Sequence, residues 1–406
     1  MSWKLVKIGD VCKTGAGGTP LKSKKEFYDG GTIPWLLSGE VSQGEIFSSR
    51  KFITEKGLQN SSAKIFPTNT VLVAMYGATA GQVGILRFEA STNQAVCGIY
   101  PNDKLLPKFI YYSMLSKQKE LIGKAAGNAQ PNISQIKVKN TEIPLIDLEE
   151  QKRIVAILDE AFAGIDTAIA NTEKNLANAR ELFESYLNSV FTQENDSWPS
   201  HNLEDLTEEK SNITYGVVKP GPEGEIVFVR GGDIVSGRIR IEKLRTITKD
   251  VSEQYSRTLL RGGEILICLV GVPGQTAVVP SELSGANIAR QVGLVRLKSE
   301  INPHFVSYYL RSRVGLKNLG NFTGGSVQQV INLRDLKQVC VPLPNRSKQN
   351  SVVVHLDQVF EQSRQLAEIY KQKIESLVEL KQSLLQKAFS GELTAEADKL
   401  MDEAVA

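Results

Sequence analysis

Apolar residues recur at alternating steps of four and three along two long stretches of the chain. In the first stretch, nine of ten such positions are apolar: Leu158, Phe162, Ile165, Ile169, Thr172, Leu176, Ala179, Phe183, Tyr186 and Val190. The mean step of 3.5 residues predicts a helix wound against a partner helix, because this period keeps one apolar seam facing that partner. A helix is therefore expected over residues 158–190.

The second stretch repeats the first at an offset of 198 residues. Its positions are Leu356, Phe360, Ser363, Ala367, Tyr370, Ile374, Leu377, Lys381, Leu384 and Ala388, with Ser363 and Lys381 as the weak ones. The shared offset favours pairing of the two helices with each other over two amphipathic helices on separate cores. The expected seam residues are Leu158, Phe162, Ile165, Ile169, Leu176, Phe183, Tyr370, Ile374, Leu377 and Leu384.

Two blocks of short strands precede the helices. In the first block, alternation over residues 3–11, apolar runs over 33–37 and 70–76, and an exit strand over 142–145 are separated by glycine turns, and a helix is expected after Pro107. Many short strands with a few helices are typical of an irregular α+β domain. The pattern does not determine the order of the strands.

The second block repeats the plan of the first. Residues 226–239 align with 33–46 at an offset of 193, and residues 341–343 align with 143–145 at 198. A few small insertions over this length indicate an internal duplication. Asp147 and Asn345 are suitable N-terminal caps for the two helices. The expected domains are recognition block 1 (1–147), helix 1 (148–191), recognition block 2 (192–345), helix 2 (346–391) and a flexible tail (392–406).

The net charge of +3 is distributed unevenly along the 406 residues. The two blocks carry net charges of +7 and +2, whereas the helical segments 148–191 and 346–406 carry −4 and −2. Basic blocks suit a polyanionic partner. The four cysteines show no metal-ligand spacing, the N-terminus has no signal-peptide core, and the apolar run Ile265–Val270 is too short to cross a membrane. A cytoplasmic location is expected.

Fragments that suggest catalysis have simpler explanations. The segment Gly77–Gly84 lacks the Gly-Lys-Ser/Thr ending of a phosphate loop, and its glycines are mis-spaced for dinucleotide binding. The acidic residues Asp159 and Glu160 belong to the outer face of the first helix. The three histidines are scattered, so no metal site or catalytic triad is expected. The sequence predicts a binding protein without catalytic residues of its own.

Basic and amide side chains in the predicted loops are the candidates for DNA contact, because Lys and Arg neutralise phosphates and Gln can read adenine. The alternative for each is an ordinary solvated side chain. The candidates are Lys22, Lys24, Lys25, Thr79, Gln82, Arg230, Arg238, Arg240 and Gln275.

A set of ordered motifs, present in both halves, resembles the specificity subunits of Type I restriction–modification enzymes. The motifs are Gly18-Thr19-Pro20, Ile33-Pro34-Trp35, Gly39-Glu40-Val41, Thr92-Asn93-Gln94-Ala95, Gln130-Pro131-Asn132-Ile133, Ile143-Pro144-Leu145, residues 150–155, Ile213–Gly221 with Arg230 and Asp233, and residues 384–393. Each motif is weak alone, whereas their order and repetition are specific. The resemblance covers residues 1–393.

The resemblance implies two target-recognition domains, each reading one half of a split, double-stranded DNA site, and two helices that pair antiparallel as a spacer. It also implies docking of two DNA adenine methyltransferase subunits, and of two restriction subunits. S-adenosylmethionine, ATP and magnesium would belong to those partners, and this chain would need no cofactor. The alternatives are a methylation-only system, a self-contained DNA-modifying enzyme and a coiled-coil scaffold that does not bind DNA.

Overall fold

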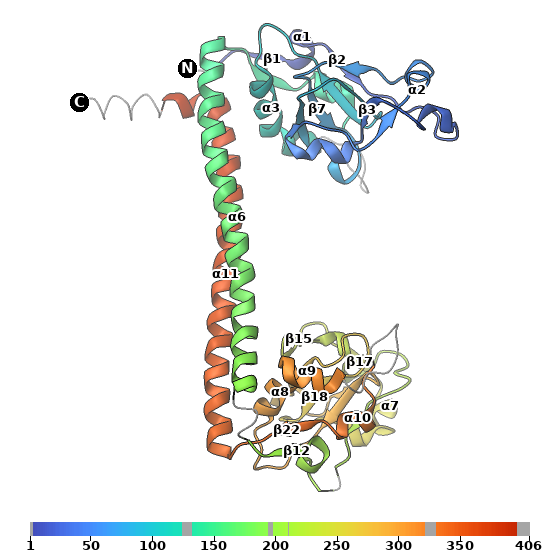
Figure 1. The fold of residues 1–406 in the computed structure, drawn as a ribbon, viewed down its shortest axis with the longest axis vertical. Helices are drawn as coiled ribbons and strands as arrows, with labels where there is room; N and C mark the ends of the chain where they lie inside the picture. The colour runs from blue at the N-terminus through green and yellow to red at the C-terminus, as the bar shows by residue number, and fades with distance from the viewer. Residues whose placement is uncertain (1–2, 124–131, 194–197, 210, 321–329, 396–406) are drawn as a thin grey trace, which may run out of the picture. The chain divides into compact units, whose positions relative to one another are not determined.

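The computed structural model describes residues 3–123, 132–193, 198–209, 211–320 and 330–395. The chain forms two compact units, one made of Met1–Thr172 with Gln372–Ala406 and the other of Glu173–Lys371. Each unit combines one α+β block with part of each of two long helices, α6 and α11 (Figure 1). The unit boundaries therefore fall inside the long helices.

The first block contains a five-stranded sheet, a four-stranded sheet and a two-stranded pair. In sheet order, the strands are β2 (Thr14–Ala16), β10 (Val96–Ile99), β7 (Val71–Ala74), β8 (Val83–Leu86) and β4 (Glu45–Ile46); β5 (Phe52–Ile53), β3 (Ile33–Leu36), β9 (Ala90–Thr92) and β6 (Ile65–Phe66); and β1 (Leu5–Lys7) with β11 (Glu142–Pro144). The helices are α1 (Ile8–Val11), α2 (Glu55–Gln59), α3 (Pro107–Ser116), α4 (Gln118–Gly123) and α5 (Gln135–Lys139).

The second block is built from smaller sheets. In sheet order, the strands are β13 (Thr214–Tyr215), β21 (Val292–Val295), β18 (Ile265–Cys268) and β19 (Thr276–Val278); β17 (Arg245–Ile247), β14 (Ile226–Val229) and β20 (Asn287–Ile288); β12 (Ser200–Asn202) with β22 (Cys340–Pro342); and β15 (Ile234–Val235) with β16 (Arg238–Ile239). The helices are α7 (Lys249–Glu253), α8 (Pro303–Arg311), α9 (Arg313–Gly320) and α10 (Leu333–Lys337).

The two blocks share one topology, which confirms the predicted internal repeat. A fully buried strand lies between two antiparallel neighbours in each block, β7 between β10 and β8, and β18 between β21 and β19. Each block also contains a parallel pair at the same place, β3 with β9 and β14 with β20, and the first block has a further one, β4 with β8. The first strand of each block pairs with its last, so the chain leaves each block beside the point where it entered.

The strand expected over residues 3–11 is shorter than its pattern suggests. Only Leu5–Lys7 is extended, and Ile8–Val11 forms the short helix α1. The Ile8 side chain is fully buried, its amide donates to the Thr141 carbonyl, and its own carbonyl accepts from the Cys12 amide. Burial of Ile8 therefore turns the chain inward before the alternation can continue.

Helix α6 spans Leu148–Gln193 and helix α11 spans Arg346–Ser390. The predicted caps are present, because Asp147 Oδ1 accepts from the Glu150 amide at 2.9 Å and Asn345 Oδ1 accepts from the Lys348 amide at 3.0 Å. These bonds satisfy amides that the first turn of a helix leaves without a partner.

The long helices pair antiparallel within each unit. In the first unit, the Arg153 side chain donates to the Thr394 carbonyl, and the Lys381 side chain donates to Asp166. Residue numbers therefore rise along α6 while those of the contacted residues fall, which is the antiparallel arrangement. In the second unit, the Phe183 and Phe360 rings lie 5.0 Å apart, and four residues earlier on α6 the Ala179 carbonyl accepts a bond from the Ser363 hydroxyl. The predicted pairing of the two helices is confirmed.

Polar residues on the seam have partners that offset the free-energy cost of burying them. The Ser363 hydroxyl donates across the seam to the Ala179 carbonyl, and the Thr172 hydroxyl donates to the Ala168 carbonyl of its own helix. Lys381 pairs with Asp166 and lies over the Phe162 ring, 4.8 Å from its centroid. The two weak positions of the second heptad pattern are thus satisfied by hydrogen bonding and by a cation–π contact.

The heptad pattern is wrong at Tyr186. This side chain is 36% exposed, whereas its neighbour Leu187 is fully buried. Phe183, Leu187 and Phe191, spaced four residues apart, form a stripe that joins the core of the second block. The stripe shifts because this end of α6 packs on the block as well as on α11.

Residues 392–395 were expected in a flexible tail and are ordered instead. Glu392–Ala395 are helical, and the side chains of Leu393 and Thr394 are only 8% and 5% exposed. Leu393 packs in the core of the first block, which explains the order of these residues. Residues 396–406 lie outside the described part of the chain, as do Gln130 and Pro131, the first two residues of one expected motif.

One glutamine at the start of each long helix ties the helix to its block. Gln151 is fully buried, accepts from the Leu106 amide at 2.8 Å and donates to the Lys104 and Ile146 carbonyls at 2.9 Å. Gln349, 198 residues later, accepts from the Asn302 amide at 2.8 Å and donates to the Pro344 carbonyl at 2.7 Å. The repeat therefore preserves a buried polar contact as well as a fold.

The substitution Gln151→Ala should lower the free energy of unfolding by roughly 2–3 kcal/mol, because it leaves a buried amide and two carbonyls without their partner. Urea unfolding of the full chain would measure the loss. The exposed neighbour provides the control, since Lys152→Ala should change stability by less than about 0.5 kcal/mol. Equal effects of the two substitutions would contradict the role assigned to Gln151.

Candidate nucleic-acid interface

A turn follows the central buried strand of each block and carries three of the candidate DNA-binding residues. It spans Tyr76–Gln82 in the first block, after β7, and Val270–Gln275 in the second, after β18. Equivalent glycines in both turns have positive φ, Gly77 and Gly81 at 73° and 83°, Gly271 and Gly274 at 98° and 86°. Glycine adopts this conformation without steric cost, so the repeat requires the same backbone at both places.

The polar side chains of these turns are available for binding. Thr79 and Gln82 are half-buried, and the Thr79 hydroxyl lies 3.5 Å from the Tyr76 carbonyl. Within the described residues, no hydrogen bond reaches the side-chain amides of Gln82 and Gln275, and the Gln275 Oε1 is buried without a donor. An amide that the protein leaves unsatisfied can pair with the edge of a base.

The basic loop of the first block is a separate feature. Lys22, Lys24 and Lys25 are all exposed, and Lys24 Nζ lies 5.3 Å from the centroid of the Phe27 ring. This loop packs beside α2 through the Glu26–Lys56 ion pair of 2.6 Å, whereas the turn at Gly81 lies against α4. The structure therefore does not bring the lysines and the Thr79–Gln82 turn into one cluster.

The arginines of the second block have protein partners. Arg230 donates twice to Asp233 at 3.1 Å, and Arg240 donates to the Gly232 carbonyl at 2.8 Å, so both lie around the same short turn. Arg238 faces α11, 3.8 Å from Glu361 and 4.9 Å from the centroid of the Phe360 ring. These arginines remain candidates, and Arg230 and Arg240 are the better placed of the three because both are exposed away from the long helices.

Several residues that the sequence motifs emphasise support the fold instead. Glu40 and Asp233 are equivalent buried acids that accept from the amides of Leu37 and Arg230, at 2.9 and 2.8 Å. Asn287 is fully buried and bonds to Thr258 and Ser252 at 2.7 and 3.1 Å. Their polar atoms are occupied within the protein and are not available to a ligand.

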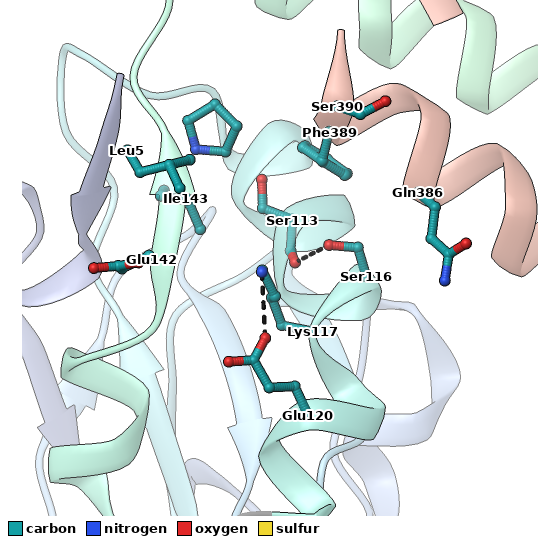
Figure 2. A pocket seen from close by; sticks show the side chains of 11 residues that line it. Leu5, Ser113, Ser116, Lys117, Glu120, Glu142, Ile143, Gln386, Phe389 and Ser390 are labelled. Carbon is teal, nitrogen blue, oxygen red and sulfur yellow. Dashed lines mark hydrogen bonds and ion pairs between the residues drawn. The ribbon is translucent and has the colours of Figure 1, made fainter. Parts of the chain in front are cut away.

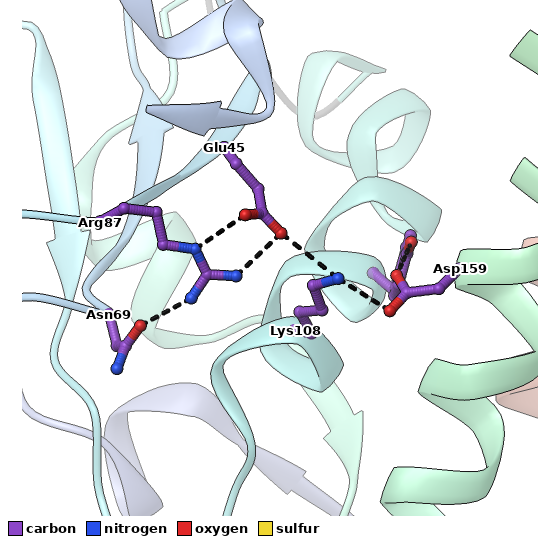
Figure 3. Close-up of polar contacts among 6 residues, drawn as sticks. Glu45, Asn69, Arg87, Lys108 and Asp159 are labelled. Carbon is purple, nitrogen blue, oxygen red and sulfur yellow. Dashed lines mark hydrogen bonds and ion pairs between the residues drawn. The ribbon is translucent and has the colours of Figure 1, made fainter. Parts of the chain in front are cut away.

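A polar network joins the first block to α6 and has no counterpart in the sequence motifs. Figure 3 shows Arg87 donating twice to Glu45, at 3.0 and 2.8 Å, and Lys108 bridging Glu45 and Asp159, at 3.3 and 2.7 Å. The side-chain Oδ1 of Asn69 accepts from Arg87 at 2.7 Å. The network therefore links β4 and β8 to α3, and α3 to α6.

The charges of this network shift one another's protonation. The hydrogen bond from Arg87 lowers the pKa of Glu45, while the bond to Asp159 raises the pKa of Lys108 against the opposing effect of partial burial. Burial and the 2.6 Å bond to Asp159 raise the pKa of Tyr112. The second block keeps the tyrosine and the acid, as Tyr308 bonds to Asp357 at 2.5 Å. Sequence spacing could have revealed this pair, because both residues repeat at offsets of 196 and 198.

The described residues contain no group of three or more His, Cys, Asp and Glu side chains arranged to hold a metal ion. Burial raises the pKa of the Cys97 thiol to about 12, so this cysteine is held as the unreactive thiol. Among the described helices, none is long and apolar enough to cross a membrane.

Two similar blocks with polar turns, each packed on a pair of antiparallel helices, define a duplicated recognition protein. The sequence matches the family described as Type I restriction modification DNA specificity domain over residues 1–178 and 186–376. The chain belongs to this family, as the resemblance of its motifs predicted. It is thus a Type I specificity subunit by family, a class defined by DNA recognition.

Relatives from bacteria and archaea align over most of the chain. The EcoBI specificity subunit of Escherichia coli is 28% identical over 333 residues, covering 76% of this chain and 70% of the relative. The MjaIX specificity subunit of Methanocaldococcus jannaschii is 26% identical over 425 residues, covering 97% and 94%. The similarity therefore includes both blocks and both helices.

Solved structures show the same fold. A chain from a study of assembly and conformational transition of the type I R-M system has a TM-score of 0.77 at 21% identity, covering 97% of this chain and 98% of that one. The HsdS subunit from Thermoanaerobacter tengcongensis has a TM-score of 0.57 at 20% identity, with 97% of each chain covered. The fold class predicted from the repeat is confirmed.

The substitution Glu45→Gln should lower the free energy of unfolding at pH 7 by only about 0.5 kcal/mol, because the carboxylate is more than one-third exposed. Because the folded pKa of Glu45 is lowered, its carboxylate stabilises the fold fully at pH values above the unfolded pKa of 4.5. This stabilisation is lost as the pH falls through the folded pKa. The difference between the two proteins should therefore shrink as the pH falls below 4.5 and vanish below the folded pKa of Glu45. Urea unfolding across pH would measure this, with exposed Glu89→Gln as control.

Proposed function

We propose that this chain is a non-catalytic subunit that reads a bipartite, asymmetric DNA target, one half with each block. One observation carries the proposal: the blocks repeat one backbone but present different side chains at the same turn. Between the equivalent glycines, the first turn offers Ala78, Thr79 and Ala80, whereas the second turn is one residue shorter and offers Val272 and Pro273. Two blocks of the same fold that present different side chains are suited to a target whose two halves differ in sequence.

The chemistry of the exposed groups supports DNA as the ligand. Thr79, Gln82 and Gln275 can contact base edges, whereas the lysines of residues 22–25 with Arg230 and Arg240 can contact phosphates. The net charges of +7 and +2 on the blocks favour approach to a polyanion. Phosphate contacts of this kind would make the affinity fall steeply with salt.

The long helices serve as spacer and docking surface in this proposal. Residues 148–191, which lie in α6, carry a net charge of −4, which disfavours DNA and suits protein partners, whereas Arg346–Ser390 of α11 carry +2 and the −2 of residues 346–406 comes from residues 391–406. DNA adenine methyltransferase subunits, and where present restriction subunits, would dock there, two of each. S-adenosylmethionine, ATP and magnesium would be bound by those partners, so that this chain supplies recognition alone.

Mapping of adenine methylation in cells that express this chain with its modification partner tests the proposal. The expected product is a motif of two short, unlike half-sites separated by unread bases. A perfectly palindromic motif would contradict the asymmetry. Methylation without sequence preference, or methylation by the purified chain alone, would contradict the function itself.

A pair of matched substitutions controls the assignment of halves in that experiment. Gln82→Ala should relax base choice in one half-site, and Gln275→Ala in the other, each by roughly 1–3 kcal/mol of discrimination. Because the turns are equivalent, each variant serves as the reference for the other.

Insertion of seven residues into both α6 and α11 tests the spacer. Seven residues preserve the heptad seam and lengthen each helix by about 10 Å, which corresponds to about three base pairs of B-DNA. The mapped motif should gain about three unread base pairs and keep both half-sites. Changed half-sites with an unchanged spacer would show that the helices do not set the distance.

A further inference from the structure

A groove in the first unit lies where the strand pair β1–β11, helix α3 and the end of α11 meet (Figure 2). Its volume is about 330 Å³, within the range of ligand-sized pockets. Leu5, Ile143 and Phe389 provide apolar walls, and Ser113 of α3 also lines it. This groove plays no part in the DNA-reading turns described above.

The second block fills the equivalent place with a tyrosine of its own. Helix α8 repeats α3 at an offset of 196, so Tyr309 corresponds to Ser113. The Tyr309 side chain is 1% exposed, its hydroxyl donates to the Cys340 carbonyl at 2.9 Å and accepts from Asn318 Nδ2 at 2.8 Å. Its ring lies edge-on to the Phe191 ring with centroids 5.4 Å apart.

The surroundings of that tyrosine are repeated in the first unit. Phe389 corresponds to Phe191 and Glu142 corresponds to Cys340, both at an offset of 198, and both line the groove. The tyrosine itself is missing, because Ser113 stands in its place, and no asparagine stands where Asn318 lies in the second block. The Ser113 hydroxyl is buried and, within the described residues, has no hydrogen-bond partner. The first block therefore lacks one aromatic side chain that its twin contains.

We propose that this groove binds the side chain of a tyrosine from a partner protein. The phenol ring would pack on Phe389, and its hydroxyl would donate to the main-chain carbonyl of Glu142, as Tyr309 does at the equivalent positions. The groove has a polar rim, made by Lys117 and Glu120 as a 3.2 Å ion pair and by Gln386. Buried aromatic anchors within a polar rim are typical of protein interfaces.

The chain's own C-terminal segment does not fit this requirement. Although Ser390 lines the groove, residues 391–406 contain no aromatic residue. The occupant is therefore assigned to another polypeptide. This inference is independent of how the blocks read DNA, because neither the groove nor its twin includes a residue of the reading turns.

Titration of the full chain with p-cresol, a tyrosine side-chain analogue, tests the pocket by NMR of labelled isoleucine and leucine methyl groups. One p-cresol per chain is expected, with shifts at Leu5 and Ile143. Ser113→Tyr should supply the missing ring, weaken p-cresol binding at least tenfold and raise the melting temperature. No binding, or equal binding by the two proteins, would overturn the proposal.

The internal repeat offers a matched control. Tyr309→Ser should open the twin groove and raise the stoichiometry from one p-cresol to two, whereas Ser113→Ala should leave the wild-type value. Failure of a folded Tyr309→Ser protein to gain a site would overturn the equivalence on which the proposal rests. Circular dichroism would establish that each variant is folded.

A photo-reactive residue placed at Gln386 tests the occupant in the complex assembled with the modification partner. A cross-linked partner peptide that contains a tyrosine, lost in the Ser113→Tyr variant, would support the proposal. A peptide without tyrosine, or a second copy of this chain, would overturn it. Because no DNA is needed, these outcomes do not depend on whether the proposed DNA recognition is correct.

Discussion

The apolar seam between α6 and α11 is the interaction on which the rest of the structure depends. Each block lacks a complete core without it: Leu158 and Leu385, from opposite helices, share the core of the first block, and Leu187 and Leu356 share that of the second. Burial of each such side chain contributes roughly 1.5–3 kcal/mol. Separation of the helices would therefore expose both cores, so pairing and block folding are coupled within each unit.

The duplication preserves this frame and varies the chemistry around it. The bonds of Tyr112 to Asp159 and of Tyr308 to Asp357 hold equivalent helices together in both blocks. Around them the charges differ, because Lys108 bridges two acids in the first block, whereas in the second Arg238 packs on the α11 ring of Phe360. The first block is attached through a lysine between two acids, and the second through an arginine that contacts both the Glu361 carboxylate and the Phe360 ring.

The helices were predictable because their heptad pattern and caps are read from residues close in sequence. Their pairing and the duplication were predictable because the same pattern recurs at a fixed offset. Sheet order was not, because strands of two to four residues carry little pattern and β3 pairs in parallel with a strand more than fifty residues away. Tyr186 was misplaced because the block competes with α11 for that helix face. The direction of Arg238 toward Glu361 depends on tertiary packing that spacing cannot express.

The motifs that identify the family owe their regularity to the frame. Trp35 is buried and donates to the Gly18 carbonyl at 2.9 Å, and a side chain at Gly18 would collide with the backbone of Ser62 and Ala63. Glu40 closes its own turn. These residues hold the backbone of the first block in place, and the polar atoms of Trp35 and Glu40 are occupied within the protein. In the proposed function, the side chains that distinguish DNA sequences are therefore expected between the motifs, as in the turns after β7 and β18, where the two blocks differ.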